Sequence, residues 1–150
     1  MRKNKNKVTC GILLHTPDGC LLCHPTGREY GMESFDIPKG VKEQNETEWE
    51  CAVRELKEET SVDFKTLDVS YIENLGRFPY TKEKDIHLFY IETNTRVDVD
   101  KLKCTSLIDN SNKPEVDGYK ITEDITQWVF KSLKNVLSNP TFMVRLTKCL

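Results

Sequence analysis

Runs of apolar residues mark the expected strands of this chain. The runs at 7–14 and 20–23 flank HTPDG, whose Asp-Gly pair is typical of a β-hairpin turn. Two longer runs, at 68–80 and 85–93, are rich in aromatic and β-branched residues and are expected to pair through the connection TKEK. The stretch FDIPKG at 35–40 predicts a brief strand that ends in a tight turn.

Two segments show the 3.6-residue spacing of amphipathic helices. The first begins at Thr47, which can form a capping box with Glu50. Its expected buried face consists of Trp49, Ala52, Val53 and Leu56. The second helix is expected over about 124–137, where the stretch SNP ends it. Its expected buried residues are Ile125, Trp128, Val129, Leu133 and Val136.

The remaining segments complete a mixed α/β pattern. Residues 94–114 are polar and turn-rich, which is typical of a long surface excursion that contributes to a pocket rim. The stretch EVDGYKI at 115–121 predicts a short strand before the second helix. Because strands come before, between and after the helices, we expect a mixed sheet with helices packed on its faces. No internal repeat is visible, and 1–150 is expected to form a single domain.

Composition narrows the class of protein. Hydrophobic residues make up 37% and charged residues 31% of the chain, the formal net charge is -2, and no run of eighteen apolar residues occurs. These values predict a soluble globular protein without a membrane span and without the basic surface needed for duplex nucleic acid. Nothing in the first residues resembles an export signal, so a cytoplasmic location is expected.

The six cysteines are expected to be free thiols, because a cytoplasmic chain of this length needs no disulfides. The run CLLCH at 20–24 matches a haem-attachment pattern, and with His15 it offers four potential zinc ligands. In a strand, however, Cys20 and Cys23 point to opposite faces, as do Cys23 and His24. We therefore interpret this run as packing, with Cys23 behaving as a small buried hydrophobe.

Three carboxylates crowd one face of the first predicted helix, close to its C-terminal end. Glu55, Glu58 and Glu59 lie at i, i+3 and i+4, where like charges cost roughly 0.2–0.5 kcal/mol per pair. The helix dipole opposes each of them by a further ~0.3–1 kcal/mol. Crowded carboxylates become favourable when a divalent cation such as Mg²⁺ or Mn²⁺ lies among them. The alternative is a solvated charged surface.

The spacing of the surrounding residues favours the metal site. Gly40 is followed after five residues by Glu46 and after seven more by RELKEE at 54–59, with Ser61 and Val62 closing the run. This pattern resembles the Nudix box, G-x5-E-x7-R-E-U-x-E-E-x-G-U, where U is a bulky aliphatic residue. FDIPKG resembles the entry to that box in several branches of the family. The resemblance implies a Nudix-type α/β/α sandwich with a mixed β-sheet.

One position departs from the box. Ser61 stands where the family has its second glycine, the left-handed residue that ends the helix. That conformation costs a non-glycine residue roughly 1–2 kcal/mol. This cost is small against a stability of ~5–15 kcal/mol, and the acids precede the position.

The resemblance implies an enzyme. Nudix hydrolases cleave the pyrophosphate bond of nucleoside diphosphates linked to a moiety X, with Mg²⁺ or Mn²⁺ as cofactor and water attacking phosphorus. A compact phage or bacterial member acting on ADP-ribose, FAD or diadenosine polyphosphates is favoured. Two alternatives stay open: removal of a pyrophosphate-linked cap from RNA 5′ ends, which the basic residues Arg2, Lys3, Lys5 and Lys7 would support, and a nucleotide-sensing domain without catalysis. A homodimer is also left open.

The resemblance also assigns residues to the site. The implied metal ligands are the carbonyl of Gly40 and the side chains of Glu55, Glu58 and Glu59. Glu55 also orients or deprotonates the attacking water, Arg54 holds the acids, and Glu46 pairs with Arg54 as a structural residue. Glu115 is the candidate for a further acid from a later loop, with Asp117 as the neighbouring alternative.

Residues outside the box are expected to recognise the nucleotide. Lys39 and the two arginines, Arg28 and Arg77, are candidates for contacts with phosphate oxygens. Phe78, Tyr80 and Tyr90 are candidates for stacking on an adenine. The alternative for these aromatic residues is burial in the core, because they lie on predicted strands.

Overall fold

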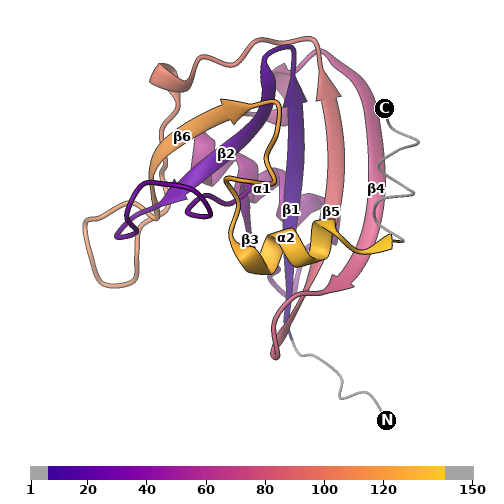
Figure 1. The fold of residues 1–150 in the computed structure, drawn as a ribbon, viewed down its shortest axis with the longest axis vertical. Helices are drawn as coiled ribbons and strands as arrows, with labels where there is room; N and C mark the ends of the chain where they lie inside the picture. The colour runs from indigo at the N-terminus through magenta and orange to yellow at the C-terminus, as the bar shows by residue number, and fades with distance from the viewer. Residues whose placement is uncertain (1–6, 141–150) are drawn as a thin grey trace.

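The computed structural model describes residues 7–140, which form a mixed sheet covered by helices on both faces (Figure 1). The strands are β1 (Lys7–Thr16), β2 (Gly19–Pro25), β3 (Lys39–Val41), β4 (Val69–Pro79), β5 (Lys84–Thr93) and β6 (Val116–Thr122). The helices are α1 (Glu48–Thr60), α2 (Lys131–Leu137) and two short 3₁₀ turns, η1 (Phe64–Thr66) and η2 (Val99–Lys101). The predicted hairpins are present, and the mixed sheet is confirmed.

The sheet has the strand order β4-β5-β1-β2-β6. Strand β1 runs parallel to β5 on one side. On its other side, β1 pairs with β3 through Thr9–Gly11 and with β2 only near the hairpin turn, at His15–Thr16. Because β2 separates from β1 after the turn, β3 fits against the first half of β1. This places the start of β3 beside the middle of β1, where α1 packs against it.

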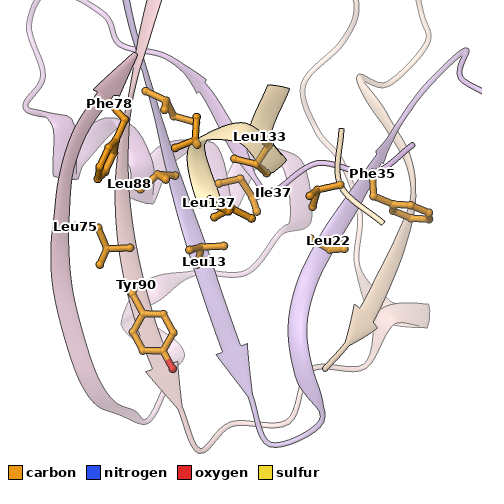
Figure 2. Packing of buried hydrophobic residues seen from close by; sticks show 13 residues of the cluster. Leu13, Leu22, Phe35, Ile37, Leu75, Phe78, Leu88, Tyr90, Leu133 and Leu137 are labelled. Carbon is orange, nitrogen blue, oxygen red and sulfur yellow. The ribbon is translucent and has the colours of Figure 1, made fainter. Parts of the chain in front are cut away.

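Two hydrophobic cores result, one on each face of the sheet. Alternating residues of β1 serve both, with Ile12 and Leu14 facing α1 and Leu13 facing α2. Figure 1 shows the two helices on opposite faces, and Figure 2 shows Leu133 and Leu137 of α2 packed toward Leu13 and Leu22. The predicted α/β/α arrangement is confirmed.

Helix α1 forms for the reasons expected from its sequence. Thr47 Oγ1 accepts a hydrogen bond from Glu50 N (3.1 Å), and Glu50 Oε1 accepts one from Thr47 N (2.9 Å), so the capping box is complete. On the buried face, Ala52 and Leu56 are fully inaccessible, whereas Trp49 packs at the margin. The helix ends at Ser61, whose backbone is left-handed (φ 66°), as the box predicts.

The second helix is shorter than predicted. It begins at Lys131 rather than at 124, although it ends as expected at Leu137. The preceding residues instead pair with Phe35: Phe35 N donates to Trp128 O (2.9 Å), and Phe130 N donates to Phe35 O (2.9 Å). A helix that began at 124 would need Trp128 O and Phe130 N for its own hydrogen bonds, but both groups bond to Phe35. Trp128 and Val129 are therefore apolar because they pack in a turn, not because they lie on a helix.

The strand predicted at 35–40 is present only from Lys39, as β3, and it continues through Gly40 instead of turning there. Phe35 and Asp36 make isolated bridges to Val129 and Cys23, and regular pairing starts only at Lys39.

The cysteines follow the packing interpretation. Cys10, Cys20, Cys23, Cys51 and Cys104 are free, and Cys23 is buried. Cys149 lies outside the described residues. Between residues 7 and 140, no helix has the length and apolar character needed to span a membrane.

Candidate active site

The acidic face of α1 packs on the backbone of β3. Glu55 and Glu59 are only 7% and 8% exposed. Glu59 Oε1 accepts a hydrogen bond from Lys39 N (3.1 Å). The Glu55 carboxylate occupies the space over Gly40, because a Cβ built on Gly40 would lie 2.0 Å from Glu55 Cδ. Glycine at position 40 therefore permits the close approach of this carboxylate.

Arg54 organises the other acids. Its Nε and Nη2 donate to the two carboxylate oxygens of Glu46 (2.9 and 2.6 Å). Its Nη1 donates to Glu55 Oε1 (2.9 Å) and Glu58 Oε2 (3.2 Å). Hydrogen bonds from Arg54 lower the pKa of Glu46 to about 2. The expected Glu46–Arg54 pair is present, and the guanidinium holds two acids of the helix as well.

Two buried carboxyl groups, those of Glu55 and Glu59, have too little positive charge around them to offset the cost of burying an ionised carboxylate. Burial raises the pKa of Glu55 to about 7, although the charge of Arg54 opposes the shift. Burial raises the pKa of Glu59 to about 8, although the hydrogen bond from Lys39 N opposes it. A cation near these groups would favour their ionised forms.

The donors at this face fit a hard divalent cation. Glu55, Glu58, Glu59 and the Gly40 carbonyl supply only oxygen ligands, which Mg²⁺ and Mn²⁺ prefer. As the side chains stand, no three His, Cys, Asp or Glu side chains within residues 7–140 converge as metal ligands. Arg54 engages Glu55 and Glu58 in this arrangement, and Glu58, whose side chain is 38% exposed, is the freest of the acids to reorient.

A cavity of about 180 Å³ adjoins Glu59. It is lined by Cys23, Pro25, Asp36, Ile37, Lys39, Glu59, Glu115 and Val116. Glu115 thus shares the cavity with Glu59, whereas Asp117 turns away and contacts His24 Nδ1 (2.5 Å). Of the two acids considered from the sequence, Glu115 is the one at the cavity.

The long excursion before Glu115 binds the end of α1. Thr105 N donates to Glu58 O (2.7 Å), and Lys103 N donates to Thr60 O (3.3 Å). Ser106 O, next to Thr105 in the same segment, accepts a hydrogen bond from Glu115 N (2.9 Å). This segment therefore fixes the later acid relative to the helix that carries the others.

The expected nucleotide contacts are only partly brought together. Lys39 lines the cavity, and its Nζ lies 5.6 Å from the Tyr80 ring centroid. Arg28 lies outside the cavity lining, with its guanidinium 4.7 Å from the Phe130 ring. Arg77 bonds Asp85 on the neighbouring strand (2.9 Å).

Two of the expected stacking residues require correction. Phe78 and Tyr90 are 5% and 2% exposed and belong to the core under α2 (Figure 2). Their rings have no face open to a base in this arrangement. Their strands carry alternating apolar residues into that core, so the burial alternative holds for both.

Two residues of the site were not identified from the sequence. Asp36 lines the cavity and bonds Lys39 Nζ (3.2 Å), and Tyr119 donates its hydroxyl hydrogen to Glu59 O. The three-residue spacing of Asp36 and Lys39 within FDIPKG is a local signal that could have suggested the first. Tyr119 depends on the pairing of β2 with β6, which no local pattern indicates.

Ser61 provides a stability test at the end of α1. Its N–H donates to Lys57 O (2.8 Å), and its Oγ accepts from Lys103 N (3.3 Å). We expect Ser61→Gly to raise the free energy of unfolding by about 0.5–1 kcal/mol, because relief of left-handed strain exceeds the loss of the hydroxyl contact. Ser61→Ala keeps the strain and should be less stable than the parent protein. Urea unfolding in which Ser61→Gly is no more stable than Ser61→Ala would contradict this account.

Gly40 provides an activity test. In Gly40→Ala the new methyl group collides with the Glu55 carboxylate, so Glu55 must move. We expect kcat to fall by about 100-fold, the loss typical of a displacement of about 1 Å at a reacting centre. Val41→Ala, on the same strand but 40% exposed, should leave kcat unchanged. Steady-state kinetics showing equal kcat values for the two variants would argue against a role for this contact.

Comparisons with known proteins agree with this geometry. Residues 5–129 match the family described as NUDIX domain. A 17.7 kDa protein in the e-segB intergenic region of Enterobacteria phage T4 is 31% identical over 144 residues, covering 88% of this chain and 93% of the relative.

Solved structures share the fold. One is the binary complex of a C. elegans Ap4A hydrolase, with a TM-score of 0.61, 20% identity, and coverage of 93% of this chain and 98% of that chain. Another is a bifunctional NMN adenylyltransferase/ADP ribose pyrophosphatase from Francisella tularensis complexed with AMP and Mn, with a TM-score of 0.64 and 16% identity. That match covers 99% of this chain and 44% of the other. Since the family match extends over most of the sequence, this protein belongs to the Nudix hydrolase family.

Proposed function

We propose that this protein hydrolyses the pyrophosphate bond of nucleoside diphosphate-X compounds with an ADP half, using Mg²⁺ or Mn²⁺. The observation that carries the proposal is the pair of buried acids, Glu55 and Glu59, packed on the glycine backbone of β3 and short of positive charge. In such an arrangement the energetic deficit of the carboxylates is relieved when a cation binds.

The ligands proposed for the metal are Glu55, Glu58, Glu59 and the Gly40 carbonyl. Glu115, directly before β6, lines the cavity beside Glu59 and is the proposed further acid. When bound, a divalent cation neutralises the pyrophosphate and makes water a better nucleophile at neutral pH. Arg54 fixes the directions of Glu55 and Glu58 through its hydrogen bonds.

Glu55 is the residue proposed to orient the attacking water. Its raised pKa, about 7, suits a group that accepts a proton near neutral pH. Lys39 lies in the cavity within reach of Glu59 and is the proposed contact for a phosphate oxygen, where its charge would offset that of the substrate.

ADP-ribose and diadenosine polyphosphates are the favoured substrates. The C. elegans structure is of an Ap4A hydrolase, and the Francisella protein is described as an ADP ribose pyrophosphatase, so two proteins of this fold act on compounds with an ADP half. FAD is proposed as a substrate on the family resemblance alone. We also propose that the chain works as one Nudix domain in the cytoplasm.

A substrate panel tests the proposal. Purified protein is incubated with ADP-ribose, Ap4A, FAD and a capped RNA oligonucleotide, each with Mg²⁺, with Mn²⁺ or with EDTA, and products are identified by mass spectrometry. AMP among the products of ADP-ribose, Ap4A or FAD, formed only with metal, supports the proposal. Ligand binding without any product would instead favour the sensing domain.

The sequence also suggests removal of RNA caps and formation of a homodimer. Removal of RNA caps depends on the basic residues Arg2, Lys3, Lys5 and Lys7, of which the first three lie outside the described residues and Lys7 begins β1. Homodimer formation is a second hypothesis, which the molar mass in solution tests.

A further inference from the structure

An exposed tyrosine, Tyr30, is held by ring stacking and a hydrogen bond in the segment between the cavity residues Pro25 and Asp36. Tyr30 is 63% exposed, yet one face of its ring is stacked on the His24 imidazole, with centroids 3.7 Å apart and planes inclined by 9°. Its hydroxyl donates to Asp117 Oδ1 (3.2 Å). Since His24 covers the inner face, the surface that Tyr30 presents to solvent includes the outer face of the ring.

The support beneath Tyr30 is rigid. His24 is fully buried, bonds Asp117 through Nδ1 (2.5 Å), and meets Phe35 edge-on at 5.2 Å. The register shift between His24 and Pro25 inserts an extra residue, Asp117, into β6, and its side chain meets His24. A buried imidazole held by a carboxylate fixes the orientation of the ring that lies on it.

A strand glycine leaves room for the tyrosine hydroxyl. A Cβ built on Gly118 would lie 2.2 Å from Tyr30 Oη. Glycine inside a strand weakens it and often marks the close approach of another group. Here the approaching group is the Tyr30 side chain, so the sequence of β6 accommodates the position of this ring.

The segment that carries Tyr30 begins and ends at the cavity. Pro25 and Asp36, on either side of it, both line the cavity. Thr26 N donates to Glu115 O (3.0 Å), and Glu33 N donates to Gln127 O (3.1 Å), so its backbone is held at both ends. Asp117, which bonds Tyr30, is two residues after the cavity acid Glu115 in the sequence. Tyr30 is thus carried by a segment whose two ends line the cavity.

We propose that the outer face of Tyr30 is the platform on which the purine base of the nucleotide substrate stacks. The proposal rests on the proposed function and names the residue that recognises the base, in place of the buried Phe78 and Tyr90. A preordered aromatic ring binds a base with little loss of conformational entropy, and base–aromatic stacking depends on the π-face rather than on hydrogen bonds.

Titration with AMP tests the platform without turnover. Binding is measured by calorimetry in EDTA, so the result does not depend on a metal. Tyr30→Ala is expected to weaken AMP binding about 10-fold, equivalent to about 1.4 kcal/mol. Tyr30→Phe, which keeps the ring, should stay within about 3-fold of the parent protein. Met32→Ala is the matched control, because Met32 is 66% exposed in the same segment and carries no ring.

Gly118→Ala tests the same platform without removing the tyrosine. Its methyl group displaces the Tyr30 hydroxyl, so AMP binding should weaken although the ring is still present. Circular dichroism and thermal unfolding check that each variant is folded. On ADP-ribose, Tyr30→Ala should raise KM and leave kcat within about 2-fold, as expected for loss of binding shared by ground and transition states.

Undetectable AMP binding by the parent protein, or equal binding by the parent and Tyr30→Ala, would overturn the platform. Lack of metal-dependent hydrolysis by the parent protein would instead contradict the proposed function, and the AMP titration would still decide the role of Tyr30.

Discussion

Replacing Glu59 by Gln is expected to lower kcat by at least about 100-fold while the protein stays folded. Loss of one preorganised electrostatic contribution at a reacting centre typically costs about 10²–10³ in rate. The amide is nearly the same size as the carboxylate and can still accept from Lys39 N, so the packing of Glu59 on β3 is preserved. Glu58→Gln is expected to behave likewise. Rates are measured on the best substrate of the panel with Mg²⁺ in excess.

Glu59→Gln should also raise the free energy of unfolding of the metal-free protein, by an amount that depends on pH. Burial raises the pKa of Glu59 from 4.5 to about 8, so the folded protein binds more protons than the unfolded chain between these values. Stability therefore falls as pH rises through this window, and Glu59→Gln removes that loss. Thermal unfolding in EDTA should show a difference in Tm that grows from pH 5 to pH 8.

A carboxylate elsewhere on α1 serves as the control. Glu48 lies in the first turn, where a negative charge is favourable to the helix dipole. Glu48→Gln should therefore keep full activity and lose about 0.3–1 kcal/mol of stability, the opposite pattern. Full activity with Mg²⁺ in both Glu58→Gln and Glu59→Gln would refute the assignment of these acids.

Helix α1 and its acids were predictable because every determinant is local. The capping box joins Thr47 to a residue three positions on, and Glu55, Glu58 and Glu59 share a face through helical spacing. The left-handed Ser61 followed from the end of the box. Such features depend on neighbours along the chain, which a sequence displays directly.

The second helix was predicted too long because its competitor is distant in sequence. Trp128 O and Phe130 N hydrogen-bond to Phe35, more than ninety positions earlier, and no local sequence pattern indicates that pairing. A turn packed against a core shows the same apolar residues as a helix face.

The nucleotide side of the site was also hard to predict. Tyr30 and Gly118 meet only because β2 pairs with β6 in one register, whereas Phe78 and Tyr90 were plausible only until their burial was known.

Replacing Arg54 by Ala is expected to damage stability and activity together. One guanidinium bonds Glu46, Glu55 and Glu58, and the side chains of Glu46 and Glu55 are only 12% and 10% exposed. Removing one partner of a buried ion pair costs about 3–5 kcal/mol, and exposed pairs contribute at most about 1 kcal/mol. Because the Arg54 side chain is 26% exposed, we expect a loss of roughly 2–3 kcal/mol in urea unfolding without metal.

Arg54→Lys distinguishes the effect of the positive charge of Arg54 from the effect of its planar set of hydrogen-bond donors. Lysine keeps a positive charge but cannot donate in a planar fork to both oxygens of Glu46, so its stability should fall between those of Arg54→Ala and the parent protein. Mg²⁺ should restore part of the stability of Arg54→Ala, since a cation among Glu55, Glu58 and Glu59 replaces some of the lost charge. Its kcat should remain low, because Glu55 and Glu58 are no longer held in direction. If Arg54→Ala unfolds within about 0.5 kcal/mol of the parent protein and keeps its kcat, the guanidinium does not organise these acids.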